Sequence, residues 1–226
     1  MSSAFEGDLS SGVPAAQHAV YRVLGSFFLP PDPDRLSTLV AAVPELERVA
    51  QPLEGLAGHR TWTGLLRRLE SLDDDDVERM GTEYTSLFLS GSRDLTVQPF
   101  ESSYVPVSEY EVASVSAAVE ARYRRAGLQL TSTGELPDHL AVELEFCAYL
   151  CHQEGDTTDD SDAARWRAER RAFLSDHLVR WLPSFAEKLA RVMPDSPYLQ
   201  AAEVARAVTA DDLVVIDAFA AASAPI

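Results

Sequence analysis

Hydrophobic residues along most of this chain recur at the three- and four-residue spacing of amphipathic helices. Positions 20, 23, 24, 27 and 28 are apolar and fall on one side of a helix. Pro30 and Pro31 come next, and proline cannot continue a helix because it lacks the backbone N–H. The pattern therefore predicts a first helix that begins at Ala16 and ends before Pro30.

The same spacing predicts helices along the rest of the chain. The acidic run Asp73 to Asp76 suits the positive end of a helix dipole, and Ser108 followed by Glu111 has the spacing of a capping box. Pro183 is expected to interrupt a long helix. The predicted helices after the first cover residues 34–43, 61–72, 73–88, 109–126, 137–151, 166–181, 185–192, 199–208 and 211–222.

Other segments lack helical spacing. Residues 1–14 are rich in serine and glycine and are expected to form a flexible tail. Residues 97–104 and 129–136 are predicted to be loops, and the acidic stretch 154–162 a solvated linker. With 226 residues the chain can bury one substantial core, so we predict an all-α fold, a single-domain helical bundle at residues 15–226.

The protein is strongly acidic, with a formal net charge of −17 and an isoelectric point near 4.6. Binding to phosphates needs clustered cations, so nucleic acid and anionic membranes are excluded as partners and a basic or neutral partner is favoured. No stretch reaches the roughly 18 apolar residues of a membrane-spanning helix, and the N-terminus lacks the features of a signal peptide. We therefore expect a cytoplasmic protein without membrane insertion.

One predicted helix carries residues that could ligate a metal: His139, Glu143, Cys147 and Cys151. They are four residues apart and share a face, but they span about 18 Å along the helix axis, too far for a single ion. The two cysteines are therefore predicted to be small core residues, and neither a metal nor a cofactor is expected. No phosphate-binding glycine loop or nucleophile elbow occurs, so no catalytic residue is assigned.

Asp138 and His139 allow two interpretations. A carboxylate can orient an imidazole for general acid–base chemistry, but neighbouring residues on a helix point about 100° apart. Alternatively, Asp138 caps or charges the start of the helix and His139 bonds a neighbouring loop.

Aromatic residues cluster on both sides of the first predicted loop: Tyr84, Phe88, Phe100 and Tyr104. Core packing is one interpretation, and it suits Phe88 best. In the other, the loop with Pro99, Glu101 and Ser102 lines a groove with an apolar floor and carboxylates at its rim. Such a groove suits a peptide with an apolar stretch next to arginines, because a carboxylate accepts two hydrogen bonds from one guanidinium.

Three patterns follow one another in a fixed order. The first consists of residues 84–91, with the sequence YTSLFLSG, and residues 99–104, with the sequence PFESSY. The second is residues 135–146, with the sequence ELPDHLAVELEF. The third is a four-residue repeat of large side chains at Phe173, His177, Trp181 and Phe185. Together they resemble the TorD/DmsD/NarJ-type chaperones of molybdenum-dependent oxidoreductases, which carry an aromatic-x-x-Leu-Phe segment, a Pro-aromatic-x-Ser loop and a Glu-x-Pro-Asp-His signature. The agreement extends over about residues 16 to 208, and the loop at 101–104 favours the TorD/DmsD branch.

This resemblance implies an all-helical chaperone of the TorD/DmsD type that is not an enzyme. Such a protein binds the twin-arginine signal peptide and apo form of a molybdopterin oxidoreductase catalytic subunit until the cofactor is inserted, and some members exchange helices within a homodimer. By motif match the peptide-binding residues are Tyr84, Phe88, Pro99, Ser102, Tyr104, Asp138 and His139. Glu101 and Glu143 join Asp138 as the carboxylates expected to pair with the client's arginines, while its apolar stretch covers the aromatic floor.

Two alternatives remain. A NarJ-like assembly factor would recognise a nitrate-reductase-type subunit and act before membrane attachment. A hydrolase or metal enzyme would use His139 with Asp138 or Glu143.

Overall fold

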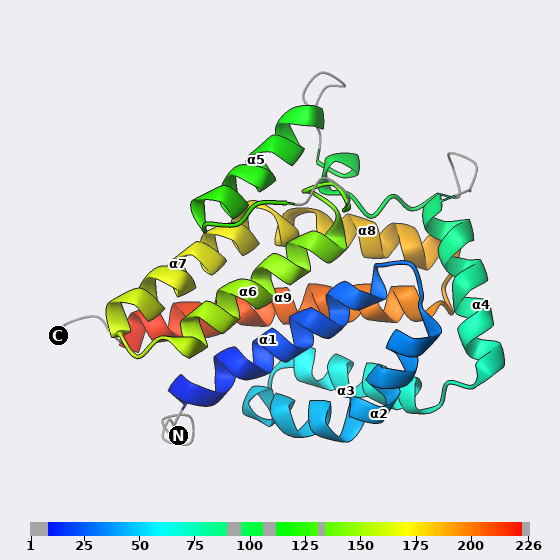
Figure 1. Cartoon of the computed structure of the whole chain (residues 1–226), viewed down its shortest axis with the longest axis horizontal. Coiled ribbons are helices and arrows are strands. Elements are labelled where there is room, and N and C mark those ends of the chain that lie inside the picture. The colour runs from blue at the N-terminus through cyan, green and yellow to red at the C-terminus, as the bar shows by residue number, and fades with distance from the viewer. Residues whose placement is uncertain (1–8, 90–95, 106–111, 131–133, 223–226) are drawn as a thin grey trace.

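The computed structural model describes residues 9–89, 96–105, 112–130 and 134–222, and over these residues the fold is all-α, as predicted (Figure 1). The helices are α1 Leu9–Phe27, α2 Pro33–Ala50, α3 Ala57–Glu70, α4 Asp74–Tyr84, α5 Val112–Arg125, α6 Leu140–Asp156, α7 Asp160–Asp176, α8 Leu178–Val192 and α9 Pro197–Ala222. A π-helical turn at Thr85–Leu89 extends α4, and short 3₁₀ turns occupy Gln51–Leu53 and Glu101–Ser103.

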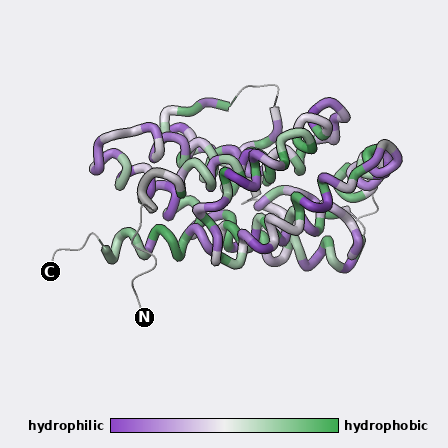
Figure 2. The backbone as a smooth tube through the Cα atoms, turned by 90° about the horizontal axis from the view of Figure 1, so that it is seen from below, coloured by the Kyte–Doolittle hydropathy of each residue, from purple (hydrophilic) through white to green (hydrophobic). Residues whose placement is uncertain are grey.

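The helices pack around a core to which α1, α6, α8 and α9 contribute most of their apolar side chains. α1 lies along α6, α9 runs behind both of them, and α4 stands at the opposite end of the molecule from the C-terminal end of α9 (Figure 1). Gly25 lets α1 approach α6 closely, because a Cβ at this position would lie 3.2 Å from the Ala141 carbonyl oxygen. Apolar and polar positions are interleaved along most helices, which is the pattern that predicted them (Figure 2).

The first helix begins earlier than its spacing indicates. α1 starts at Leu9, inside the predicted tail, and Val13 is buried. Residues 1–8 of that tail and the predicted capping box at Ser108 and Glu111 lie outside the described residues, and the single-domain boundary at residue 15 stays a prediction.

The predicted linker at 154–162 is wrong for most of its length. α6 continues to Asp156, and α7 begins at Asp160 behind an Asp159 N-cap. Glu154 is buried despite its acidic surroundings, because Arg167 and Arg170 pair with it at 2.7 and 2.6 Å. A charge that would be solvated in a linker is thus neutralised inside the bundle.

Other helix boundaries also differ from the prediction, including that of α2, which continues through Pro44 to Ala50. Pro183 lies within α8, and the break falls at His177, whose backbone leaves the helical region with φ −122° and ψ −93°. α9 is one continuous helix of 26 residues where two short helices were expected. The chain between the two predicted helices stays helical because Thr209 and Asp212 are buried and find partners there.

A buried ionic network joins α1, α6, α7 and α9. Arg170 pairs with Glu154 at 2.6 Å and with Asp212 at 3.1 Å, and all three side chains are nearly inaccessible. Asp212 also accepts hydrogen bonds from Gln17 at 2.8 Å and from Tyr21 at 2.9 Å. A buried cluster of paired charges of this kind ties four helices together, since each charge depends on the others.

Cys147 and Cys151 are free thiols that are fully buried, which confirms the prediction that they are core residues. Burial raises the pKa of both thiols, so they remain protonated. Within the described ranges, no helix combines the length and the apolar character needed to cross a bilayer.

Replacing Arg170 by alanine tests the buried network. The change leaves the Glu154 and Asp212 carboxylates buried without their cation, and we expect it to lower the free energy of unfolding by about 3–5 kcal/mol. Denaturant unfolding measures the effect. Arg171→Ala is the matched control, because Arg171 forms an exposed pair with Asp217 and its loss should change stability little. Equal effects of the two substitutions would contradict a structural role for the network.

Candidate functional site

The segment from Pro99 to Tyr104 docks on the start of α6. Glu101 donates its backbone N–H to the Asp138 carbonyl at 2.9 Å, and Leu140 donates to the Pro99 carbonyl at 2.8 Å. The two bonds flank Phe100 and His139, which form an isolated antiparallel β-bridge. The predicted loop and the predicted signature therefore meet in one place, which we call the signature junction (residues 99–104 and 135–143).

Asp138 and His139 bond different partners inside this junction. Asp138 accepts a hydrogen bond from the Ser102 backbone N–H at 3.2 Å, and its second oxygen is buried without a partner. His139 is the N-cap of α6, where its Nδ1 accepts the Ala141 N–H at 3.2 Å. The roles are the reverse of the structural interpretation above, in which Asp138 capped the helix and His139 bonded the loop.

Burial sets the protonation state of His139. It lowers the pKa of the imidazole to about 4, although the neighbouring Asp138 carboxylate acts in the opposite direction. A neutral ring is what an N-cap requires, because a protonated Nδ1 could not accept the backbone N–H. The side chain packs edge to face against Phe100, with 5.0 Å between ring centres.

Two buried carboxyls connect the junction to α8. Glu101 bonds His177 Nδ1 at 2.8 Å, and Glu143 accepts the Trp181 indole N–H at 3.1 Å. Burial and the nearby Glu101 carboxyl raise the pKa of Glu143 well above its usual range, against the indole bond. Glu143 is therefore held as a neutral acid at the centre of the junction.

A row of aromatic rings links the junction to α4. Trp181 stacks on Tyr104, Tyr104 meets Phe185, Phe185 meets Phe88, and Phe88 meets Tyr84, with ring-centre distances of 5.6, 5.9, 6.5 and 5.0 Å. Phe88 is buried, as predicted, and Tyr84 donates its hydroxyl to the Phe28 carbonyl at 3.3 Å. The two ends of the first motif are thus brought together although residues 90–95 separate them.

The nine predicted site residues therefore lie in one connected region, but most of them face inward. Glu101, Asp138 and Glu143 are 2%, 1% and 0% exposed, so they are interior groups and do not form a rim. Only Ser102 and Tyr104 are partly exposed. The large exposed apolar side chains of the motifs are Leu89, at the end of the π-helical turn, and Leu136, in the signature loop, which are 67% and 59% exposed.

His177, Trp181 and Tyr123 belong to this region and were absent from the predicted site. Tyr123 donates its hydroxyl to the Pro137 carbonyl at 2.7 Å and so fixes the signature loop from α5. His177 and Trp181 carry the third motif, whose four-residue spacing was the signal that could have placed them here. The sequence offers no comparable signal for Tyr123.

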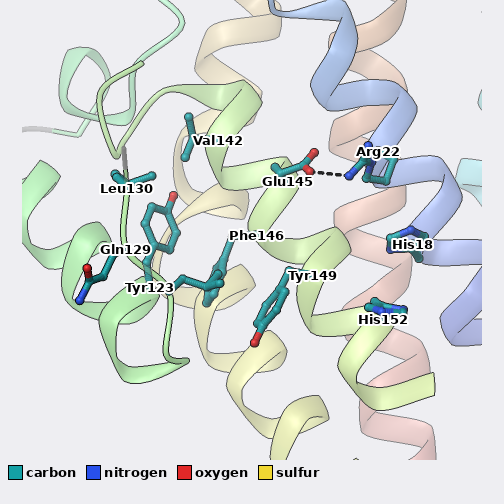
Figure 3. Close-up of a pocket in the computed structure, with 11 residues that line it drawn as sticks. His18, Arg22, Tyr123, Gln129, Leu130, Val142, Glu145, Phe146, Tyr149 and His152 are labelled. Carbon is teal, nitrogen blue, oxygen red and sulfur yellow. Dashed lines mark hydrogen bonds and ion pairs between the residues drawn. The ribbon is translucent and has the colours of Figure 1, made fainter. Parts of the chain in front are cut away.

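The structure also has concave surfaces beyond the hydrogen-bonded centre of the junction. A cavity of about 310 Å³ between α1, α5 and α6 has a wall formed by Tyr123, Phe146 and Tyr149, and the Arg22–Glu145 ion pair crosses its edge (Figure 3). A groove of about 630 Å³ lies between α2 and α4. No cluster of three or more potential metal ligands occurs within the described parts of the chain.

The sequence model of the family described as nitrate reductase delta subunit matches residues 51–187, more than half of the chain. The chain therefore belongs to this family, and its resemblance to TorD/NarJ-type chaperones is confirmed.

Individual relatives carry the names of assembly chaperones. The chain is 35% identical over 125 residues to the selenate reductase assembly chaperone protein of Thauera selenatis. The aligned residues make up 54% of this chain and 63% of that protein. It is 48% identical over 56 residues to the chlorate reductase assembly chaperone protein of Ideonella dechloratans, and these residues make up 24% of this chain and 29% of that protein. These matches thus cover less than two thirds of either relative.

A longer match is found with the chaperone protein TorD of Vibrio cholerae, at 26% identity over 152 residues, 67% of this chain and 68% of that protein. Among solved structures, a protein of Archaeoglobus fulgidus described as a redox enzyme maturation protein superposes with a TM-score of 0.50 and 22% identity. That match covers 84% of this chain and 91% of the other, and it supports the fold alone. The names of the sequence relatives agree with the prediction of a chaperone.

Glu143→Gln tests the neutral acid at the junction. A raised carboxyl pKa means that, above about pH 4.5, the native state holds a proton that the unfolded chain has released, so rising pH disfavours the wild-type native state. The glutamine side chain does not titrate, so its variant lacks this pH dependence, but it can still accept the hydrogen bond from Trp181. We expect its stability relative to wild type to increase from pH 5 to pH 8 in urea unfolding. A difference that is independent of pH would show that Glu143 is ionised.

Proposed function

We propose that this protein is a cytoplasmic assembly chaperone that binds the apo form and the twin-arginine signal peptide of a molybdopterin-dependent oxidoreductase subunit until the cofactor is inserted. The observation that carries the proposal is the meeting of three family motifs at the signature junction, in a chain whose relatives are named assembly chaperones. The protein performs no covalent step of its own. A homodimer formed by helix exchange stays a prediction.

The burial of the junction divides its residues into two roles. Glu101, Asp138, His139 and Glu143 position the two loops, because their hydrogen bonds run between the loop, α6 and α8. Contact with a client falls to the groups at the surface of the same loops.

The surface of those loops is apolar with an acidic edge. Leu136 in the signature loop and Leu89 at the end of the π-helical turn are large exposed apolar side chains, and the half-buried Tyr104 stacks on Trp181 of α8. Glu135 of the signature loop is exposed, and burial together with the Glu135 carboxylate raises the pKa of Tyr84 to about 12. A peptide with an apolar stretch and arginines complements this surface.

A NarJ-like assembly factor is the second candidate, and the family description favours it, since it names the delta subunit of nitrate reductase. Such a factor would bind a subunit that carries no export signal. The hydrolase alternative gains no support, because His139 is occupied as the helix cap and Asp138 bonds the loop.

Affinity capture of the tagged protein from its native cytosol, at the host's own salt concentration, tests the proposal. Recovery of a molybdopterin oxidoreductase subunit with its signal peptide attached is the expected result. Recovery of a subunit without such a peptide would favour the NarJ-like role. Absence of any oxidoreductase subunit would contradict both.

Replacing Leu89 and Leu136 by serine in the same experiment tests the proposed surface. We expect client recovery to fall, because burying each leucine against a client would contribute about 1.5–3 kcal/mol at full burial. The thermal midpoint should stay unchanged, since both side chains are already exposed. Val214→Ser is the control, because Val214 is 64% exposed on α9. Equal recovery by the double variant and the control would place client binding elsewhere.

A further inference from the structure

The groove between α2 and α4 has an apolar floor. Its lining includes Leu36, Val40, Leu72 and Val77, with Pro31 at one end. Leu36 is 5% exposed and the other three are half-buried, so the floor is continuous with the core but open to solvent. With a volume of about 630 Å³, the groove falls in the size range of ligand-binding clefts.

The polar lining of this groove is acidic. Asp73 and Glu78 are both exposed and stand over the apolar floor, and no arginine, lysine or histidine of the described chain lines it. Nearby Arg79 is already paired with Asp76. Asp73 uses one oxygen to cap α4, with a bond of 2.8 Å from the Asp76 N–H. The groove therefore presents carboxylates that lack a cationic partner in the described structure.

Gly81 keeps the groove open from the α4 side. It lies inside the helix, where glycine is less favourable than any residue except proline. A Cβ at this position would meet only Pro31, at 3.9 Å, so close packing does not require glycine here. The missing side chain instead leaves space above Val77 and beside Pro31.

We propose that this groove binds the arginine-bearing segment of the client's peptide. Apolar side chains of the peptide lie on the floor, and its guanidinium groups pair with Asp73 and Glu78. This assignment rests on the proposed function and deepens it, because Glu101, Asp138 and Glu143 are interior groups committed to other bonds. The charge complementarity of free carboxylates over an apolar floor selects a basic, partly apolar peptide over an acidic one.

The groove also lies next to the surface already proposed for the client. Val77, Gly81, Tyr84 and Phe88 are spaced so that they share one side of α4 and its π-helical extension. Tyr84 and Phe88 belong to the aromatic row, and Val77 and Gly81 line the groove. The groove and the aromatic row are thus connected through α4, although Tyr84 and Phe88 are themselves buried.

Binding of a synthetic peptide with two adjacent arginines followed by a leucine- and alanine-rich stretch tests the assignment by calorimetry. Asp73→Asn/Glu78→Gln removes both charges, and asparagine keeps the cap of α4. We expect binding to weaken about fivefold to tenfold, with a smaller salt dependence. Glu47→Gln/Glu54→Gln is the matched control, because it makes the same change in net charge at exposed positions outside the groove.

Two substitutions at Gly81 test the floor independently. Gly81→Leu fills the groove and is expected to abolish peptide binding while the helical circular dichroism persists. Gly81→Ala adds a methyl group in open space, so it should retain binding and raise the thermal midpoint by about 2–4 °C.

The outcomes separate the groove from the proposed function. If Asp73→Asn/Glu78→Gln and Gly81→Leu both bind the peptide as tightly as the wild type, the assignment of the peptide to the groove is wrong and the chaperone role still stands. If the Glu47→Gln/Glu54→Gln control weakens peptide binding equally, the effect comes from net charge alone, and the assignment to the groove is also wrong. A wild-type protein that binds neither this peptide nor one with both arginines replaced by glutamine would contradict the proposed function itself.

Discussion

The backbone pairing of residues 99–101 with the start of α6 is the constraint on which the functional region depends. It brings a segment that follows α4 to a helix that begins about forty residues later, and it buries Asp138, Glu101 and Glu143 in one place. Three carboxyl side chains share this interior, and each has a different partner: Asp138 bonds a backbone N–H, Glu101 bonds His177, and Glu143, whose pKa is raised by burial, bonds Trp181. The acidic residues of the motifs thus hold the loops in place through buried hydrogen bonds.

Much of the fold could be predicted from the sequence, because apolar spacing reports which face of each helix is buried. Two of the exceptions have a common cause. Glu154 and Asp212 read as solvent-exposed in a linear sequence, but Arg170 brings both into the core, and this long-range pairing extends α6 and makes α9 continuous. Helix boundaries set by such contacts cannot be seen in local patterns.

The location of the candidate site was predictable to a similar extent. Motif order indicated that residues 84–104 and 135–143 belong together, and the structure joins them through the aromatic row and the bridge at Phe100. What the motifs could not indicate was orientation: the same carboxyls that suggest a cation-binding rim are interior. The exposed carboxylates of the groove are Asp73, whose place in the acidic run suggested helix capping alone, and Glu78 in the next turn of α4.

Hydrogen exchange of the backbone amides, with and without a peptide carrying two adjacent arginines and an apolar stretch, tests the central claim most directly. The claim is that the client lies along the outer side of α4 and the signature loop while the buried junction holds them in place. The predicted result is slower exchange in α4, its π-helical extension and residues 134–136, with little change in α5 and α9. Slower exchange confined to the helices around the cavity between α1, α5 and α6 would contradict it.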